Sequence, residues 1–104
     1  MSVHAVTYEA GLRQRYRQPH PAVVDKARPR VDPAAAAFLA TSPLMVLATT
    51  SASGTDASPR GGPPGFVVVL DAHHVAFADL SGNNRLDSYG NIFEHQQVGL
   101  LFLV

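Results

Sequence analysis

The sequence predicts a small, mainly β protein with an antiparallel sheet, folded as a small barrel or a sandwich. Short apolar runs rich in β-branched residues recur along the chain, and tight turns rich in Gly, Pro, Ser and Asp separate them. The helix signals are short and flank these runs. With 104 residues, 46% of them hydrophobic and 15% charged, the chain has the composition of one globular domain.

The first 31 residues are polar, basic and interrupted by three prolines, so we expect an irregular arm with a short helix near 10–17. Six of the eight Lys and Arg residues lie within the first 30 positions, opposed there by Glu9 and Asp25. We interpret 1–31 as a solvated arm or a clamp on the rest of the fold. Nucleic-acid binding is the alternative, but few aromatic residues are interleaved with the cations. Residues 32–104 form the folded domain in this interpretation.

The segment after the arm carries helix signals and then a strand signal. Asp32 suits a helix N-cap, Pro33 the first helical position, and the alanines that follow are strong helix formers until Pro43. We therefore expect a helix over 33–41. The apolar run 44–50 that follows predicts a β-strand.

Three further strands are expected along an antiparallel meander. The residues 51–56 form a hairpin turn, and 57–61 return as a short strand in which Pro59 implies an edge position or a bulge. A second turn is expected at 62–65, and a third turn, 71–74, joins the runs 66–71 and 75–80. In such a meander, 57–61 lies beside 66–71, which pairs in turn with 75–80.

The C-terminal part is expected to hold one helix and one strand. Leu86, Tyr89 and Phe93 fall at helical spacing and predict an amphipathic helix over 83–94. The run 98–104 is continuously apolar, a pattern typical of strands buried on both faces. Because it ends in a carboxylate, we expect the chain either to be truncated or to be completed by another subunit.

Two arginines stand out in an otherwise acidic body. From residue 31 onward Arg60 and Arg85 are the cations, against six carboxylates. Arg85 falls at a helix start, where a cation is disfavoured unless an anion lies between it and the free backbone N–H groups. A phosphate held by both arginines would resolve the conflict. The alternative is that Arg85 pairs with Asp79 or Asp87 or faces water, and that Arg60 is a turn residue without a ligand.

These residues also carry a family resemblance. The run "FLATSPLMVLATTSASGTDASPRGGPPGFVVVLD", followed by "GNNRLDSYGNIFEHQQVGLLFLV", resembles the pyridoxamine 5′-phosphate oxidase-like flavoproteins, in the branch that shares SPRG…PPGFV and GNNRLD blocks. The resemblance extends from about Leu12 to Val104. It implies a split β-barrel with short flanking helices, a homodimer, and FMN bound at the subunit interface.

The resemblance also implies cofactor-binding residues. Arg60 is similar to the strand residue that contacts the flavin and its phosphate, and Asn83, Asn84 and Arg85 to the turn that holds the phosphate. Four further residues would lie near the ring system, namely Ser58, Pro59, Ala78 and Asp79. Two departures stand against this pattern: Gly62 replaces an acidic residue that many relatives have, and the later strands of the family's barrel are absent.

The sequence therefore predicts an FMN-dependent oxidoreductase acting on an unidentified small molecule, with reduced nicotinamide or oxygen as electron partner. The alternatives are a non-catalytic flavin-binding or sensing module, or a truncated remnant; a deazaflavin or haem could replace FMN. We assign no catalytic residue and no metal site. Cysteine is absent, no apolar run reaches the roughly 20 residues of a membrane span, and a cytoplasmic location is expected.

Overall fold

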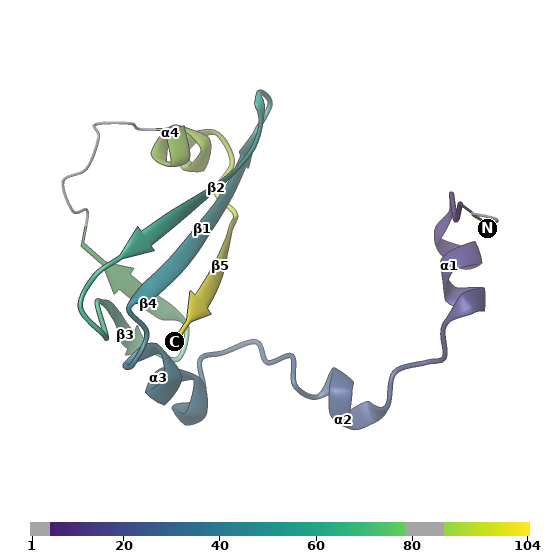
Figure 1. Cartoon of the computed structure of the whole chain (residues 1–104), viewed down its shortest axis with the longest axis horizontal. Coiled ribbons are helices and arrows are strands. Elements are labelled where there is room, and N and C mark those ends of the chain that lie inside the picture. The colour runs from purple at the N-terminus through teal and green to yellow at the C-terminus, as the bar shows by residue number, and fades with distance from the viewer. Residues whose placement is uncertain (1–4, 79–86) are drawn as a thin grey trace.

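Two antiparallel sheets form the body of the protein in the structure, a computed structural model that describes residues 5–78 and 87–104. In the first sheet, β1 (Leu44–Ser51) lies between β2 (Gly54–Gly61) and β5 (Val98–Leu103). In the second, β3 (Val67–Asp71) pairs with β4 (His74–Phe77) (Figure 1). The two sheets do not close on each other. The fold is thus mainly antiparallel β with short helices, as expected, and corresponds to part of a split barrel.

Three of the described helices precede β1, and the fourth lies between β4 and β5 in the sequence. They are α1 (Glu9–Arg15), α2 (Pro21–Val24), α3 (Pro33–Leu39) and α4 (Asp87–Glu94). The predicted start of α3 is confirmed, since Asp32 Oδ1 accepts a 2.8 Å hydrogen bond from the Ala35 N–H and Pro33 takes the first helical turn. None of the helices in the described ranges is long and apolar enough to cross a membrane.

The predicted pairing of 57–61 with 66–71 is wrong, because β2 and β3 belong to different sheets. The chain leaves the first sheet directly after β2. The Gly62 N–H donates to Pro43 O and the Gly65 N–H to Ser42 O, each at 3.1 Å. Gly65 has φ +81°, and a Cβ there would lie 2.8 Å from the Ala40 carbonyl oxygen. These contacts tie the turn to the α3–β1 connection and redirect the chain into the second sheet.

The edge position expected from Pro59 is confirmed, since β2 forms one edge of the first sheet, in register with β1 from Leu44↔Gly61 to Ser51↔Gly54. The β1–β2 turn is tighter than expected, because β2 begins at Gly54, whose φ of +134° is one that glycine adopts readily.

The first sheet has one covered face and one open face. On its inner face Met45 and Leu47 are buried together with Val67 of β3. Phenylalanines and aliphatic residues close this core, namely Phe66, Val75, Phe77, Ile92, Leu100 and Phe102. Because side chains alternate along a strand, the residues between them point to the other side. We call this side the outer sheet face; it consists of Leu44, Val46, Ala48, Ala57, Pro59, Leu101 and Leu103.

The expectation that the C-terminal strand is buried on both faces is wrong for the chain as described. Leu100 and Phe102 pack against the core, but Leu101 and Leu103 on the outer sheet face are 59% and 44% exposed. The strand is held at its end by Ser42, whose buried Oγ lies 2.7 Å from Leu103 O and 2.9 Å from Leu44 O.

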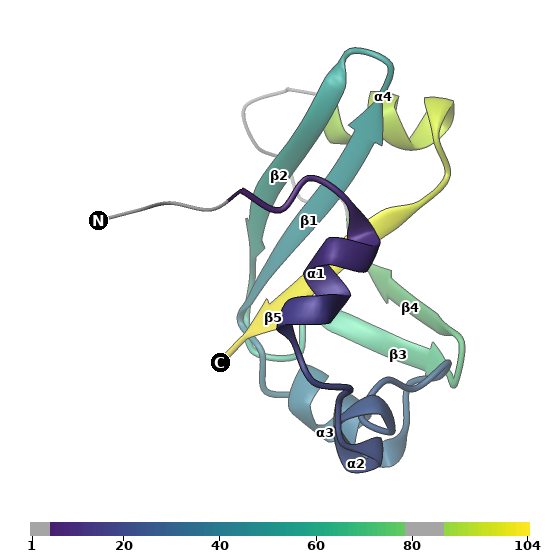
Figure 2. The ribbon, with the colours of Figure 1, turned by 90° about the vertical axis from the view of Figure 1, so that its right-hand side faces the viewer.

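The N-terminal arm extends away from both sheets, with α1 facing the outer sheet face across an open space (Figures 1 and 2). The radius of gyration is 17.7 Å, whereas a compact chain of this length has about 13 Å. The extended arm therefore raises the radius of gyration above the value of a compact chain.

Candidate functional site

The inner face of β2 and the helix α4 form the candidate site. Ser88 Oγ donates to Asp56 Oδ2 at 3.1 Å, and Asn91 Nδ2 donates to Thr49 Oγ1 at 3.0 Å. At the far end, the Ala52 N–H donates to Glu94 Oε1 at 3.0 Å. These bonds fix α4 along the β1–β2 hairpin, and they bring the start of the helix next to Arg60.

Arg60 and Tyr89 form the central contact of this site. The guanidinium Nη1 of Arg60 donates a 3.1 Å hydrogen bond to the Tyr89 hydroxyl. Its Cζ lies 5.1 Å from the centre of the Tyr89 ring, within the range of a cation–π interaction. Two contacts from one aromatic side chain therefore hold the guanidinium in a single orientation.

One donor of the same guanidinium has no acceptor. Arg60 Nε is buried and has no hydrogen-bond partner in the part of the chain that the structure describes. A buried donor without an acceptor costs free energy, more so when it is charged. Arg60 is thus a half-buried cation with donor capacity left for an anionic ligand, which is what a phosphate group requires.

The structure describes four of the eight predicted cofactor residues. Ser58 shares the inner face of β2 with Arg60, whereas Pro59 between them lies on the outer sheet face. Ala78 is exposed and directly follows β4. The other four residues, Asp79, Asn83, Asn84 and Arg85, lie outside the described residues. The convergence of Arg60 with Arg85 therefore stays a prediction.

Sequence reasoning missed the role of Tyr89. The spacing of Leu86, Tyr89 and Phe93 predicted one buried stripe, but Phe93 is 85% exposed and Leu86 lies outside the described residues. The buried side of α4 instead carries Ser88 and Ile92. One signal was available in the sequence. Arg60 has no carboxylate next to it in the chain, so its guanidinium needs another partner, and the hydroxyl of a helix tyrosine can be that partner.

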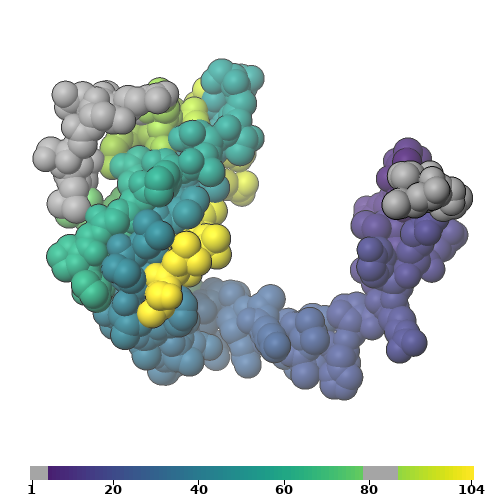
Figure 3. All heavy atoms as spheres, viewed as in Figure 1, coloured from purple at the N-terminus to yellow at the C-terminus, as the bar shows by residue number. Residues whose placement is uncertain are grey.

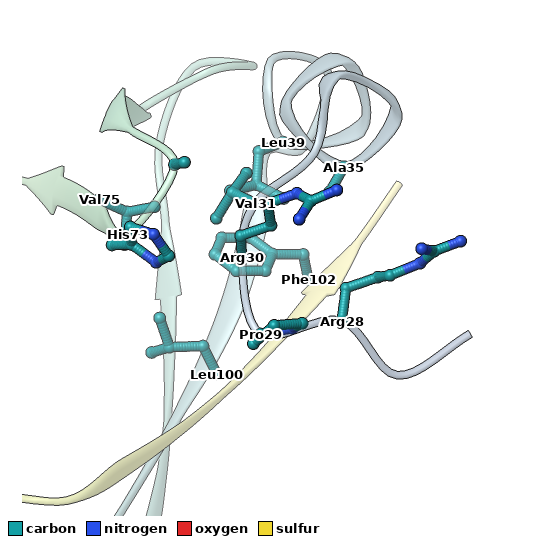
Figure 4. Close-up of a pocket in the computed structure, with 11 residues that line it drawn as sticks. Arg28, Pro29, Arg30, Val31, Ala35, Leu39, His73, Val75, Leu100 and Phe102 are labelled. Atoms are coloured by element: carbon teal, nitrogen blue, oxygen red, sulfur yellow. The ribbon is translucent and has the colours of Figure 1, made fainter. Parts of the chain in front are cut away.

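A shallow cavity of about 400 Å³ lies elsewhere, where the arm joins the body. Its lining is mainly apolar with two arginines, and comprises Arg28, Pro29, Arg30, Val31, Ala35, Leu39, Ala72, His73, Val75, Leu100 and Phe102. In Figure 4 the side chain of Arg28 points away from the apolar group around Phe102. None of the four predicted cofactor residues that the structure describes lines this cavity, and we assign it no role in the chemistry.

The histidines do not form a metal centre in the described ranges, where no group of three or more metal-ligating side chains occurs. His74 Nδ1 lies 2.8 Å from Asp71 Oδ1 at the exposed β3–β4 turn. The Asp71 carboxylate also accepts a hydrogen bond from the His73 N–H, and this bond, with that to His74, lowers the pKa of Asp71.

Comparison with known proteins assigns the chain to a family. The model described as pyridoxamine 5′-phosphate oxidase matches residues 31–104, most of the chain. The chain belongs to the pyridoxamine 5′-phosphate oxidase family. The matched range begins where the arm ends and includes both β2 and α4. No curated protein and no solved structure matches the chain significantly.

Proposed function

We propose that this pyridoxamine 5′-phosphate oxidase-like chain is an FMN-dependent oxidoreductase that acts on a small molecule in the cytoplasm. In this proposal it works as a homodimer with the cofactor at the subunit interface. The observation that carries the proposal is the state of Arg60. Its Nη1 is held by Tyr89, while its buried Nε has no acceptor among the described residues. A phosphate of FMN would supply that acceptor and neutralise the charge.

The residues of this chain would divide the binding between them. Arg60 would hold the phosphate from the strand, and Asn83, Asn84 and Arg85 from the segment that precedes α4 in the sequence. Because Tyr89 already fixes the guanidinium, Arg60 loses little side-chain entropy when the phosphate binds. Ser58, Pro59, Ala78 and Asp79 are proposed to lie near the ring system.

FMN, when bound, supplies the two-electron redox chemistry with reduced nicotinamide or oxygen as electron partner. The chain's own contribution is to bind the phosphate, orient the ring and exclude water from one side of it. We assign no side chain as a proton donor or acceptor. Acid–base chemistry is therefore left to the cofactor and substrate in this proposal.

Titration of the purified chain with FMN and with riboflavin tests the proposal, followed by visible absorption and flavin fluorescence. We expect FMN to bind more tightly than riboflavin, because riboflavin lacks the phosphate. Arg60→Lys should weaken FMN binding by at least about tenfold, since lysine offers no fork of parallel donors. It should leave riboflavin binding nearly unchanged. Arg15→Lys on the exposed helix α1 is the matched control.

Four results would contradict the proposal or part of it. No flavin binding at all would overturn it, as would equal binding of FMN by the wild type and Arg60→Lys. A preference for a deazaflavin or for haem would show that the cofactor is wrong. If reduced nicotinamide does not reduce the bound FMN and oxygen does not reoxidise reduced FMN, the chain is the non-catalytic flavin-binding module instead.

A further inference from the structure

The cavity where the arm joins the body is bounded by both sheets. Val75 of β4 lines it from the second sheet, and Leu100 and Phe102 of β5 line it from the first (Figure 4). These three side chains also pack against the buried core. The volume of about 400 Å³ lies within the roughly 300–1,000 Å³ of typical small-molecule sites. An apolar group placed in the cavity would therefore extend the core of the protein.

The arm supplies another wall of this cavity through residues 28–31. This segment is fixed to the body, because the Val31 N–H donates a 2.7 Å hydrogen bond to Ala72 O in the β3–β4 turn. In the view of Figure 3 the arm meets the body at this end and is otherwise separated from it by an open hollow. A molecule bound in the cavity would thus touch the arm and the body at the same time.

The formal charges that line the cavity have one sign. Arg28 and Arg30 belong to its lining, and no carboxylate of the described residues does. Within 5–78 and 87–104, neither arginine forms an ion pair. In the view of Figure 4, Arg30 lies closer than Arg28 to the apolar group around Phe102. Guanidinium groups bind a carboxylate through two parallel N–H donors, so this lining favours an anionic head group.

We propose that this cavity binds a small monocarboxylate with an apolar body, such as a medium-chain fatty acid. The apolar body would lie against Leu39, Leu100 and Phe102, and the carboxylate would pair with Arg30, with Arg28 farther out. The bound molecule would then hold the arm to the body. This inference goes beyond the proposed function and needs no flavin, because none of the four described cofactor residues lines the cavity.

Isothermal titration calorimetry of the purified full chain with octanoate tests the proposal. Octylammonium has the same apolar body and the opposite charge, and butanoate has the same carboxylate on a shorter body. We expect octanoate to bind at least about tenfold more tightly than either, because each comparison removes one of the two contributions.

A matched pair of alanines on α3 tests the position of the site. Ala35 lines the cavity, whereas Ala37 is exposed on the same helix and does not line it. Ala35→Leu should weaken octanoate binding by at least about tenfold, because the larger side chain takes up the space of the ligand. Ala37→Leu should leave the affinity within about twofold of the wild type. Both alanine and leucine are good helix formers, so α3 is retained in each variant.

A matched pair of arginines tests the role of charge. Arg30→Gln should weaken octanoate binding by at least about fivefold, because the carboxylate loses its guanidinium partner. Arg15→Gln removes the same charge from α1, which does not line the cavity. It should change the affinity by less than about twofold, since a distant exposed charge is screened by salt.

Limited proteolysis tests whether the ligand holds the arm to the body. Trypsin cleaves after arginine, and the bond between Arg30 and Val31 lies in the wall of the cavity. Octanoate should slow cleavage at this bond by at least about threefold, because bound ligand lowers the population of the open form. Cleavage after Arg15 in α1 is the internal control and should proceed at an unchanged rate.

Absence of octanoate binding would overturn the proposal, as would equal affinities for octanoate and octylammonium. Equal binding by Ala35→Leu and Ala37→Leu would also overturn it, and would assign the octanoate to another apolar surface such as the outer sheet face. Equal effects of octanoate on cleavage after Arg15 and Arg30 would contradict the link between arm and body. Flavin titration keeps the two proposals apart, because a chain that binds octanoate and no FMN supports this inference and contradicts the proposed function.

Discussion

Tyr89 holds Arg60 through two different contacts, although 29 positions separate them in the sequence. The tyrosine hydroxyl accepts a 3.1 Å hydrogen bond from Arg60 Nη1, and the guanidinium carbon lies 5.1 Å from the ring centre. The helix α4 is itself fixed on the hairpin by Ser88 and Asn91. The orientation of Arg60 on β2 is therefore set by α4, which comes after β3 and β4 in the chain.

Tyr89→Phe should weaken FMN binding by about three- to tenfold and leave riboflavin binding unchanged. The substitution removes the hydroxyl acceptor but keeps the ring, so part of the orientation of Arg60 is lost while α4 stays packed. Comparative titration with the two flavins measures the effect. Tyr16→Phe on the exposed arm is the control. An equal loss for both flavins would mean that Tyr89 supports the fold and does not position Arg60 for the phosphate.

Gly65 and Gly90 should respond to alanine with opposite signs. Gly65→Ala should lower the free energy of unfolding by at least about 1–2 kcal/mol, because φ is +81° and the new Cβ meets the Ala40 carbonyl oxygen at 2.8 Å. Gly90 lies in α4, where nothing is within 4 Å of an added Cβ. Gly90→Ala should raise the free energy of unfolding by about 0.5–1 kcal/mol. Urea unfolding of both variants checks the pair, and two changes of the same sign would contradict it.

Local signals predicted the elements of this fold well. Asp32 and Pro33 marked the start of α3, and Pro59 marked β2 as an edge strand, because each acts through its own backbone. The separation of β2 and β3 into different sheets was not predictable in this way. It is decided by hydrogen bonds from Gly62 and Gly65 to carbonyls about 20 residues earlier in the chain.

In the candidate site, too, some residues could be predicted from the sequence and others could not. Arg60 was found from charge alone, because a cation is rare in this body. Its partner was not found, since a tyrosine at helical spacing is also typical of ordinary core packing. The buried side of α4 was misread for a related reason: Ser88 and Asn91 resemble surface residues until Asp56 and Thr49 are placed opposite them.

Ser42 should contribute to stability through the last strand. Its buried Oγ bonds both Leu44 O and Leu103 O, and so joins the start of β1 to the end of β5. Ser42→Ala should lower the free energy of unfolding by about 1–2 kcal/mol, because two partly buried hydrogen bonds are lost. Ser53→Ala in the exposed β1–β2 turn is the control and should change it by less than about 0.5 kcal/mol. Equal effects in urea unfolding would show that the Ser42 bonds are not needed.

Asp71 should titrate below its ordinary pKa of 3.8 in the folded chain. The hydrogen bond from the His73 N–H contributes most, and that to His74 adds to it, since both favour the ionised carboxylate. A carboxyl group whose pKa is lowered by folding stabilises the fold above the unfolded pKa, and this contribution is lost as the pH falls through the folded value. The β3–β4 turn should therefore loosen below about pH 4.

Carbon-detected NMR titration of the Asp71 carboxyl measures this directly. His74→Ala should raise the midpoint part of the way toward 3.8, because the His73 N–H remains in place at 2.8 Å. Replacing His73 by alanine should leave the midpoint nearly unchanged, since its backbone donor is retained. A wild-type midpoint at or above 3.8 would show that the turn does not hold the carboxylate. Complete restoration to 3.8 by His74→Ala alone would show that the imidazole, and not the backbone donor, carries the shift.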